Sequence, residues 1–228
     1  GAADGIMKAG LEGAKQESSF GLAIRLPFET ASNSLLAGDP KLIYFRYFFT
    51  RKLMFLTHSD AVAAFPGGVG TQDELFEVLT LMQTGKANIL PLVLVEGTGG
   101  HYWVDWHQYF QKQLLQNGWV CEEDQHFFYL APSPEKAVEH ILRFYRRYHS
   151  SRYVKEYLVI RLISPLTDQQ VEQLTQNFQR LLEGGSVFKT LPLEGETDHL
   201  ELPRIAFCHN KRHFGLLRAM IDAINSFS

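Results

Sequence analysis

The chain alternates between short apolar runs and longer segments in which apolar residues recur every three or four positions. The short runs have the length of buried strands, and the longer segments have the period of helices with one buried face. Strands are expected at residues 21–26, 61–65, 90–95 and 127–130, and helices at 4–17 (with Asp4 as cap), 41–59, 103–115 and 134–144. Strands that alternate with helices in this way favour an α/β fold with a mostly parallel sheet.

The pattern changes after about residue 150. The expected elements are a strand at 156–163, a helix at 167–182, strands at 187–191 and 202–207 and a helix at 215–227. This order resembles an incomplete ferredoxin-like unit. We therefore expect two domains, residues 1–148 and a small α+β appendage at 152–228, with Tyr148–Arg152 as the linker. The appendage contains no catalytic constellation, and the sequence leaves its role open.

Composition narrows the class of protein. The chain is 45% hydrophobic with a formal net charge of −3, so there is no electrostatic argument for a nucleic-acid or membrane partner. Cys121 and Cys208 lie far apart and outside C-x-x-C spacing, so a disulfide framework or a zinc site is not expected, and a reducing cytoplasm fits. No apolar run approaches the roughly 20 residues of a transmembrane helix. We expect neither a metal nor an organic cofactor.

The segment Ala64–Leu75 joins an expected strand to an expected helix through a glycine-rich turn. The buried face of that helix would consist of Leu75, Val78, Leu79 and Met82. Gly67, Gly68 and Gly70 lack a Cβ, so the backbone can take positive φ and a bulky anion can approach its amides. The following helix aims its unpaired N–H groups and positive dipole end at the same place, which favours phosphate.

Two interpretations of this turn stay open on physical grounds, an anion-binding turn and a structural strand–helix corner. Thr71 is a plausible N-cap, and Glu74 lies three residues further on, as in a capping box. That spacing gives Glu74 an ordinary structural explanation. The glycines do not have the spacing of the P-loop or of G-x-G-x-x-G.

The motif P-G-G-x-G-T-x-x-E at Pro66–Glu74, with Arg51-Lys52 upstream, resembles the signature of the Lonely Guy (LOG) family. Its characterised members are nucleotide 5′-monophosphate phosphoribohydrolases, although the family is often labelled lysine decarboxylase. Gly1–Ala9 resembles a degraded form of the family's G-G-G-P-G-x-M-x-A turn, and Leu26–Glu29 and Tyr47–Lys52 resemble the larger bacterial members. The resemblance covers roughly residues 1–145 and implies a Rossmann-like three-layer sandwich.

The resemblance also implies roles for individual residues. Glu74 would stabilise positive charge at the ribose and act as general base for water, and Arg51 would orient Glu74 or clamp the phosphate. The implied substrate-binding positions are Lys52, Gly67, Gly68, Val69, Gly70, Thr71, Asp73, Glu29 and Thr80. From spacing alone, Arg51 is more often a surface arginine than a site residue, and Thr80 could equally be a core-facing helix residue. Val69 replaces the Tyr of many short members, so the preferred base stays open.

Two other functions, a decarboxylase and a nucleotide sensor, are alternatives to the phosphoribohydrolase. A pyridoxal-dependent lysine decarboxylase needs a Schiff-base lysine, and none of Lys41, Lys52 and Lys86 lies in a recognisable motif for it. A non-catalytic nucleotide sensor could use the same turn, because an anion site does not imply turnover. The presence of both Arg51 and Glu74 favours the enzyme, since a binder would not need that carboxylate.

The resemblance carries expectations about the whole protein. The family fold needs at least a strand, a helix and a strand before Gly1, so we expect N-terminal strands to be missing from this chain. An exposed aromatic helix at 41–59 predicts a homodimer with twofold symmetry. The expected partners are therefore a nucleoside monophosphate and a second copy of the chain, in the cytoplasm.

Overall fold

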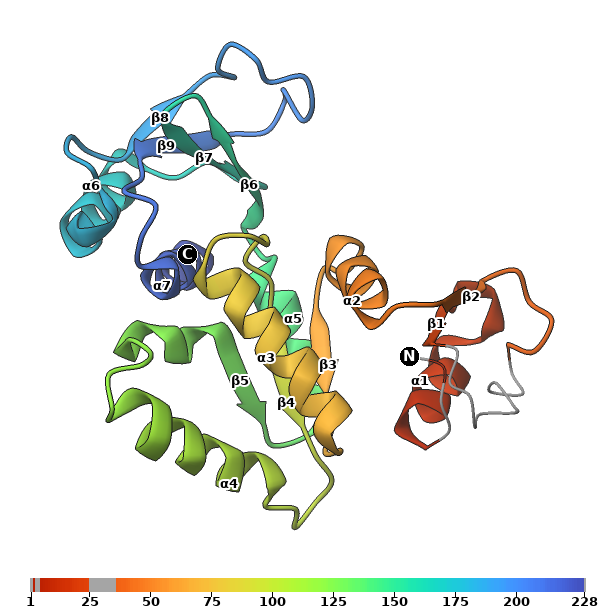
Figure 1. Ribbon diagram of the computed structural model, residues 1–228. Coiled ribbons are helices and arrows are strands. Elements are labelled where there is room, and N and C mark those ends of the chain that lie inside the picture. The colour runs from red at the N-terminus through yellow and green to blue at the C-terminus, as the bar shows by residue number, and fades with distance from the viewer. Residues whose placement is uncertain (1, 3–4, 25–35, 228) are drawn as a thin grey trace. The chain divides into compact units, whose positions relative to one another are not determined.

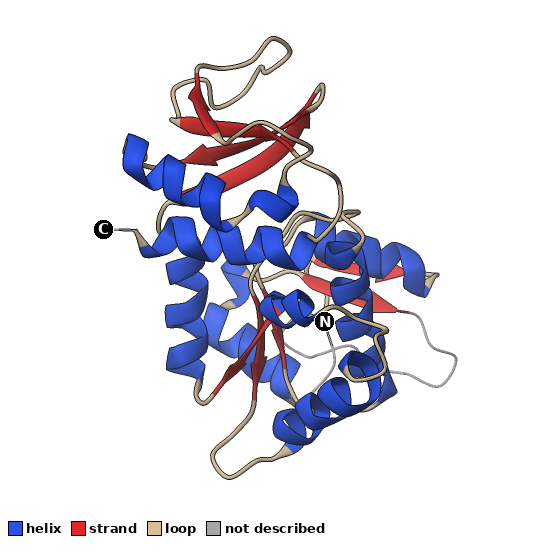
Figure 2. Cartoon of the chain, turned by 90° about the vertical axis from the view of Figure 1, so that its left-hand side faces the viewer, coloured by secondary structure: helices blue, strands red, loops and turns tan. Residues whose placement is uncertain are grey.

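A computed structural model describes residues 2, 5–24 and 36–227 (Figures 1 and 2). The chain divides into two compact units, Gly1–Ser59 and Asp60–Ser228. The fold is mixed α/β and contains parallel sheets, as the alternation of strands and helices predicts.

The first unit pairs two short parallel strands, β1 (Gly21–Ile24) and β2 (Leu42–Phe45). Its helices are α1 (Ile6–Ala14), the short 3₁₀ helix η1 (Gln16–Ser18) and α2 (Phe48–Thr57). Gly21 is buried between the strands, where a Cβ would lie 2.7 Å from Leu36 Cδ1 and 2.8 Å from Leu42 Cδ1. A larger residue at this position would require both leucine side chains to move. The expected cap Asp4 lies outside the described residues.

The prediction of one long helix over residues 41–59 is wrong. Leu42–Phe45 is a strand, and the helix begins only at Phe48. Apolar periodicity does not separate a short apolar run from a piece of helix, whereas β-branched and aromatic side chains favour a pleated surface. Pairing with β1 supplies the backbone hydrogen bonds that decide between the two.

The second unit contains a three-stranded parallel sheet in the order β3-β4-β5. Its strands are β3 (Val62–Ala64), β4 (Leu92–Val95) and β5 (Phe128–Ala131), and its helices are α3 (Val69–Gln83), α4 (Tyr102–Tyr109) with a π-helical continuation η2 (Phe110–Leu115), the 3₁₀ helix η3 (Glu122–Phe127) and α5 (Pro134–Phe144). All four residues of the central strand β4 are buried, and α5 packs against β4 and β5. The continuous apolar run at 90–95 thus corresponds to a strand covered on both faces.

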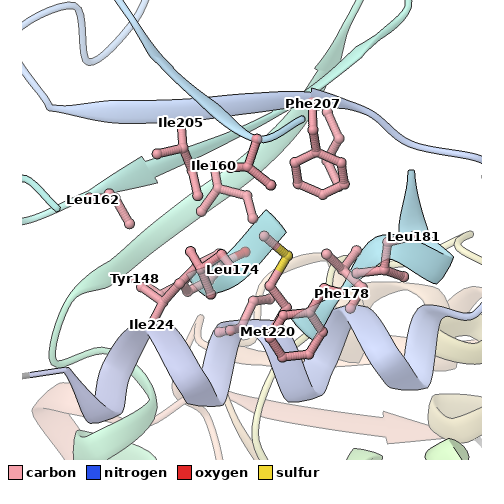
Figure 3. Close-up of a cluster of buried hydrophobic side chains, with 14 of the residues drawn as sticks. Tyr148, Ile160, Leu162, Leu174, Phe178, Leu181, Ile205, Phe207, Met220 and Ile224 are labelled. Carbon is pink, nitrogen blue, oxygen red and sulfur yellow. The ribbon is translucent and has the colours of Figure 1, made fainter. Parts of the chain in front are cut away.

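The same unit contains a four-stranded antiparallel sheet in the order β6-β7-β9-β8. Its elements are β6 (Tyr148–Val154), β7 (Tyr157–Leu162), α6 (Asp168–Asn177), η4 (Gln179–Leu181), β8 (Phe188–Thr190), β9 (Arg204–Cys208) and α7 (Phe214–Ser226). Side chains from one face of the sheet interlock with those of α6 and α7, as Figure 3 shows for Ile160, Phe207 and Met220. The expected linker Tyr148–Arg152 is instead part of β6, an edge strand of this sheet.

Helix α7 connects the antiparallel sheet to the rest of the second unit. It packs against η3, α5 and α3 as well as β6. Arg218 on this helix is 1% exposed, and its guanidinium lies 4.5 Å above the ring of Phe144. Asn225 accepts hydrogen bonds from the backbone amides of Arg147 and Tyr148, at 2.8 and 2.9 Å. The division into domains at 148 and 152 stays a prediction, while α7 lies within one compact unit with the parallel sheet.

Across the described part of the chain, none of the helices combines the length and the apolar character that spanning a lipid bilayer requires.

Candidate active site

The glycine-rich turn lies between β3 and α3, as the sequence predicts. Residues 66–70 are exposed, and α3 begins at Val69 with Gly68 as its N-cap. A glycine cap has no side chain to accept from the first-turn amides, and the helix itself offers them no carbonyl. The amides of Val69 and Gly70 therefore lie at an open helix N-terminus, which suits an anion.

Thr71 is not the N-cap of α3, and the expected capping box with Glu74 is wrong. The Thr71 amide donates to the Gly68 carbonyl at 3.0 Å, so the helix has already begun two residues earlier. Glu74 consequently lies in the second turn of the helix and needs an explanation other than capping.

The glycines of the turn matter for their small size rather than for positive φ. Positive φ occurs at eight other glycines of the described chain, but not at Gly67, Gly68 or Gly70. At Gly67 a Cβ would lie 2.2 Å from Thr71 Oγ1, so this position has no room for a side chain. At Gly68 and Gly70 a Cβ would meet nothing within 4 Å. These two positions face open space, and their small size leaves the backbone amides accessible.

A tyrosine that sequence reasoning missed holds the turn from the side of α4. Tyr102 Oη donates to the Gly67 carbonyl at 2.6 Å and accepts from Gln72 Nε2 at 2.6 Å. Its own backbone amide donates to Glu96 Oε2 at 2.9 Å. The only sequence signal was position, because Tyr102 follows the second glycine-rich loop, Gly97–Gly100, at the carboxyl end of β4.

Helix α3 presents the predicted carboxylates on a well-anchored element. The predicted buried face is confirmed, since Leu75, Val78, Leu79 and Met82 are all buried. Glu74 is half-buried, whereas Asp73 and Thr80 are exposed. The interpretation of Thr80 as a core-facing residue is therefore wrong.

The cationic residues of the predicted site lie on α2 in the first unit. Arg51 is half-buried, and its guanidinium lies 5.7 Å from the ring centroid of Phe48 and 5.3 Å from that of Phe55. Such contacts hold a guanidinium in place while leaving its N–H groups directed elsewhere. Lys52 is also half-buried. Arg51 and Lys52 are thus placed within their own unit, and Glu29 lies outside the described residues.

The structure therefore collects Gly67–Thr71, Asp73, Glu74 and Thr80 on one strand–turn–helix of the second unit. Within the residues that the structure describes, no group of three or more His, Cys, Asp or Glu side chains could hold a metal ion. Chemically, the turn can bind an anion through backbone amides, and the carboxylates can take up a proton or face a positive charge.

Comparisons with known proteins bear on the same region. The model of a family described as "Possible lysine decarboxylase" matches residues 2–141. The chain is 34% identical over 90 residues to cytokinin riboside 5′-monophosphate phosphoribohydrolase LOG1 of Arabidopsis thaliana, covering 39% of this chain and 40% of that protein. It is 33% identical over 89 residues to a probable cytokinin riboside 5′-monophosphate phosphoribohydrolase, LOGL2, of Oryza sativa subsp. japonica, covering 39% of this chain and 35% of that protein. The matches thus span less than half of each curated relative.

Proposed function

The chain belongs to the family described as possible lysine decarboxylase, and from this premise we propose that it hydrolyses the N-glycosidic bond of a nucleoside 5′-monophosphate. The products would be the free base and ribose 5-phosphate. The observation that carries this proposal is the open glycine turn at the start of α3, with Glu74 in the second turn of the same helix. The names of the relatives support hydrolysis of a nucleotide rather than decarboxylation.

The turn would bind the 5′-phosphate. The amides of Gly68, Val69 and Gly70 lie where the helix dipole favours a negative charge, and open space surrounds the two glycines. The Thr71 hydroxyl and the ammonium group of Lys52 would add donors. Phosphate binding far from the scissile bond can position that bond for attack, so removal of the phosphate should cost both affinity and rate.

Glu74 would do the chemistry at the sugar. Departure of the base passes through a transition state with oxocarbenium character, which a neighbouring carboxylate stabilises. The water oxygen would bond to C1′ while the Glu74 carboxylate takes a proton from that water. The electron pair of the broken C–N bond would leave with the base. Arg51 would orient Glu74 or clamp the phosphate, and Asp73, Thr80 and Glu29 would contact the ribose or the base.

The finer fold assignment is part of the same proposal. We infer a Rossmann-like three-layer sandwich for the region around β3, β4 and β5, because a phosphate turn at the carboxyl end of a parallel strand is typical of such sheets. We also propose a homodimer and a cytoplasmic location, and a separate small domain at 152–228. The exposed aromatic residues Tyr47, Phe48 and Phe49 support the dimer.

The test uses the chain with a panel of nucleoside 5′-monophosphates and the corresponding nucleosides, with free base followed by chromatography. The proposal predicts release of base and ribose 5-phosphate from the monophosphates, and at least about tenfold slower release from the nucleosides. Binding of monophosphates without release of base would instead identify a nucleotide sensor.

A further inference from the structure

Tyr102 lies at the first position of α4 and reaches across to the glycine turn of another strand. Its hydroxyl oxygen is 2.6 Å from the Gly67 carbonyl oxygen, which belongs to the peptide that joins Gly67 to Gly68. This hydrogen bond from Tyr102 ties down the direction of the Gly67–Gly68 peptide.

The direction of that peptide decides where an anion can bind. In a trans peptide the carbonyl oxygen of one residue and the N–H of the next point in opposite directions. If the Gly67 oxygen points toward Tyr102, the Gly68 N–H points away from Tyr102. A peptide between two glycines rotates more easily than others, because neither residue has a Cβ to restrict it. A rotation of the peptide would turn the carbonyl oxygen toward the anion and repel it.

Gln72 sets the direction of the Tyr102 proton. Gln72 Nε2 donates to Tyr102 Oη at 2.6 Å, so the hydroxyl accepts from Gln72 and its own proton remains for the Gly67 carbonyl. Gln72 Oε1 is buried and has no hydrogen-bond partner among the described residues. The bond to Tyr102 therefore orients the Gln72 side chain.

Glu96 holds the backbone end of Tyr102. Its Oε2 accepts from the Tyr102 amide at 2.9 Å. A Cβ at Gly100 would lie 2.6 Å from the same oxygen, so a larger residue there would displace the Glu96 carboxylate from the Tyr102 amide. Tyr102 is also packed edge-on against the ring of Trp103, with centroids 4.7 Å apart. Backbone, ring and hydroxyl are thus all fixed, as a positioning device requires.

We propose that Tyr102 is a positioning residue of the phosphate turn, which fixes the Gly67–Gly68 peptide so that the Gly68 amide faces the 5′-phosphate. This role rests on the proposed function for its substrate, although it can be measured by binding alone. Tyr102 itself touches neither the substrate nor the reacting atoms. Its loss should therefore act on phosphate affinity and leave the chemical step nearly unchanged.

The test is Tyr102→Phe, which keeps the ring and removes only the hydroxyl. The matched control is Tyr109→Phe, on the same helix, where the side chain is 50% exposed. Dissociation constants for ribose 5-phosphate are measured by calorimetry, and kcat and KM for a nucleoside 5′-monophosphate by release of base. We expect Tyr102→Phe to raise the dissociation constant and KM by about tenfold, with kcat within about threefold of wild type, and Tyr109→Phe to change neither.

A second variant, Gln72→Met, tests the order of the chain of hydrogen bonds. It removes the donor to Tyr102 but leaves the hydroxyl able to donate to Gly67, so its loss of affinity should lie between those of the two tyrosine variants. The substitution also removes Gln72 Oε1, a buried oxygen without a hydrogen-bond partner among the described residues, so we expect the variant to fold. A loss at Gln72→Met that exceeds the loss at Tyr102→Phe would contradict the proposed order.

The outcomes separate this proposal from the proposed function. A chain that releases no base but binds ribose 5-phosphate, more weakly in Tyr102→Phe, keeps the positioning role and rejects the hydrolase. A chain that releases base with the same KM in both tyrosine variants keeps the hydrolase and rejects the positioning role. A wild-type chain that neither binds ribose 5-phosphate nor releases base rejects both.

Discussion

The antiparallel sheet contains a buried carboxylate whose removal should be costly. Glu196 lies in the loop between β8 and β9, and its side chain is 0% exposed. Its Oε1 accepts from Arg161 Nη2 at 2.9 Å and from Arg204 Nη1 at 2.7 Å, and the Arg161 and Arg204 side chains are 4% and 0% exposed. Its Oε2 accepts from the Leu193 amide at 2.9 Å. One carboxylate thus bridges two buried guanidinium groups and fixes the loop.

The substitution Glu196→Gln keeps the shape of the side chain and removes its charge. Breaking a buried ion pair by removing one partner typically costs about 3–5 kcal/mol, because the remaining charge is left uncompensated. Asp198 still pairs with Arg161 at 2.9 Å, so we expect the lower end, about 3 kcal/mol. For a chain of this size that corresponds to a fall in the melting temperature of about 6–12 °C.

The same interactions give the stability a pH dependence. Burial by itself raises the pKa of Glu196. The Leu193 amide and the two guanidinium groups lower that pKa by more than burial raises it, so the pKa lies below the ordinary glutamate value of 4.5. A carboxylate with a lowered pKa stabilises the folded state above its unfolded value and loses that contribution as the pH falls through its folded value. The difference between wild type and Glu196→Gln should therefore be full at neutral pH and shrink below about pH 4.5.

The measurement is thermal and urea-induced unfolding, followed by circular dichroism, of wild type and two variants. Glu194→Gln is the control, because Glu194 lies in the same loop and pairs with Lys155 while its side chain is 87% exposed. An exposed ion pair contributes little, so we expect no measurable change in the control. If Glu196→Gln unfolds at the same temperature as Glu194→Gln at neutral pH, the reasoning about buried charge at this site is wrong.

Two glycine substitutions should report on close packing. Gly67→Ala places a Cβ 2.2 Å from Thr71 Oγ1, so it should lower the free energy of unfolding by about 1–3 kcal/mol and raise KM for monophosphates. Gly70→Ala meets nothing within 4 Å and lies in α3, so the same urea titrations should show no loss of stability and a gain of up to about 1 kcal/mol, because alanine is the better helix former. Gly215→Ala places a Cβ 2.4 Å from the Glu123 carbonyl oxygen, a backbone atom that cannot rotate away. Calorimetry should therefore show a melting temperature lower by about 2–12 °C. An unchanged melting temperature would mean that α7 can shift without cost.

The elements predicted best from the sequence are those whose pattern of apolar residues matches their burial in the fold. The run at 90–95 is a buried strand and Leu75, Val78, Leu79 and Met82 form the buried face of a helix, because burial on two faces and burial on one face leave distinct periods. The prediction for Leu42–Phe45 was wrong because a run of four apolar residues fits either a helix or a strand. Pairing with β1 makes it a strand.

The interactions that hold the site and the sheet were beyond sequence reasoning. Tyr102 meets Gly67 across 35 residues, and Glu196 meets Arg161 across the same sequence separation. Neither pair has a periodicity or a motif, since the contacts exist only once the strands are in place. The position of the glycine turn was predicted correctly. Positive φ, which glycine would allow, occurs at none of its three glycines. The lack of room at Gly67 could not be predicted, because it depends on where Thr71 points.

The most direct test of the proposed hydrolase is release of free base from a nucleoside 5′-monophosphate by wild type and by Glu74→Gln, with binding of ribose 5-phosphate measured on both. We expect Glu74→Gln to fold and to bind ribose 5-phosphate as wild type does, while its rate of base release falls by about a hundredfold or more. Release of base at the wild-type rate from Glu74→Gln would contradict the role of this carboxylate, and no release from wild type would contradict the hydrolase itself.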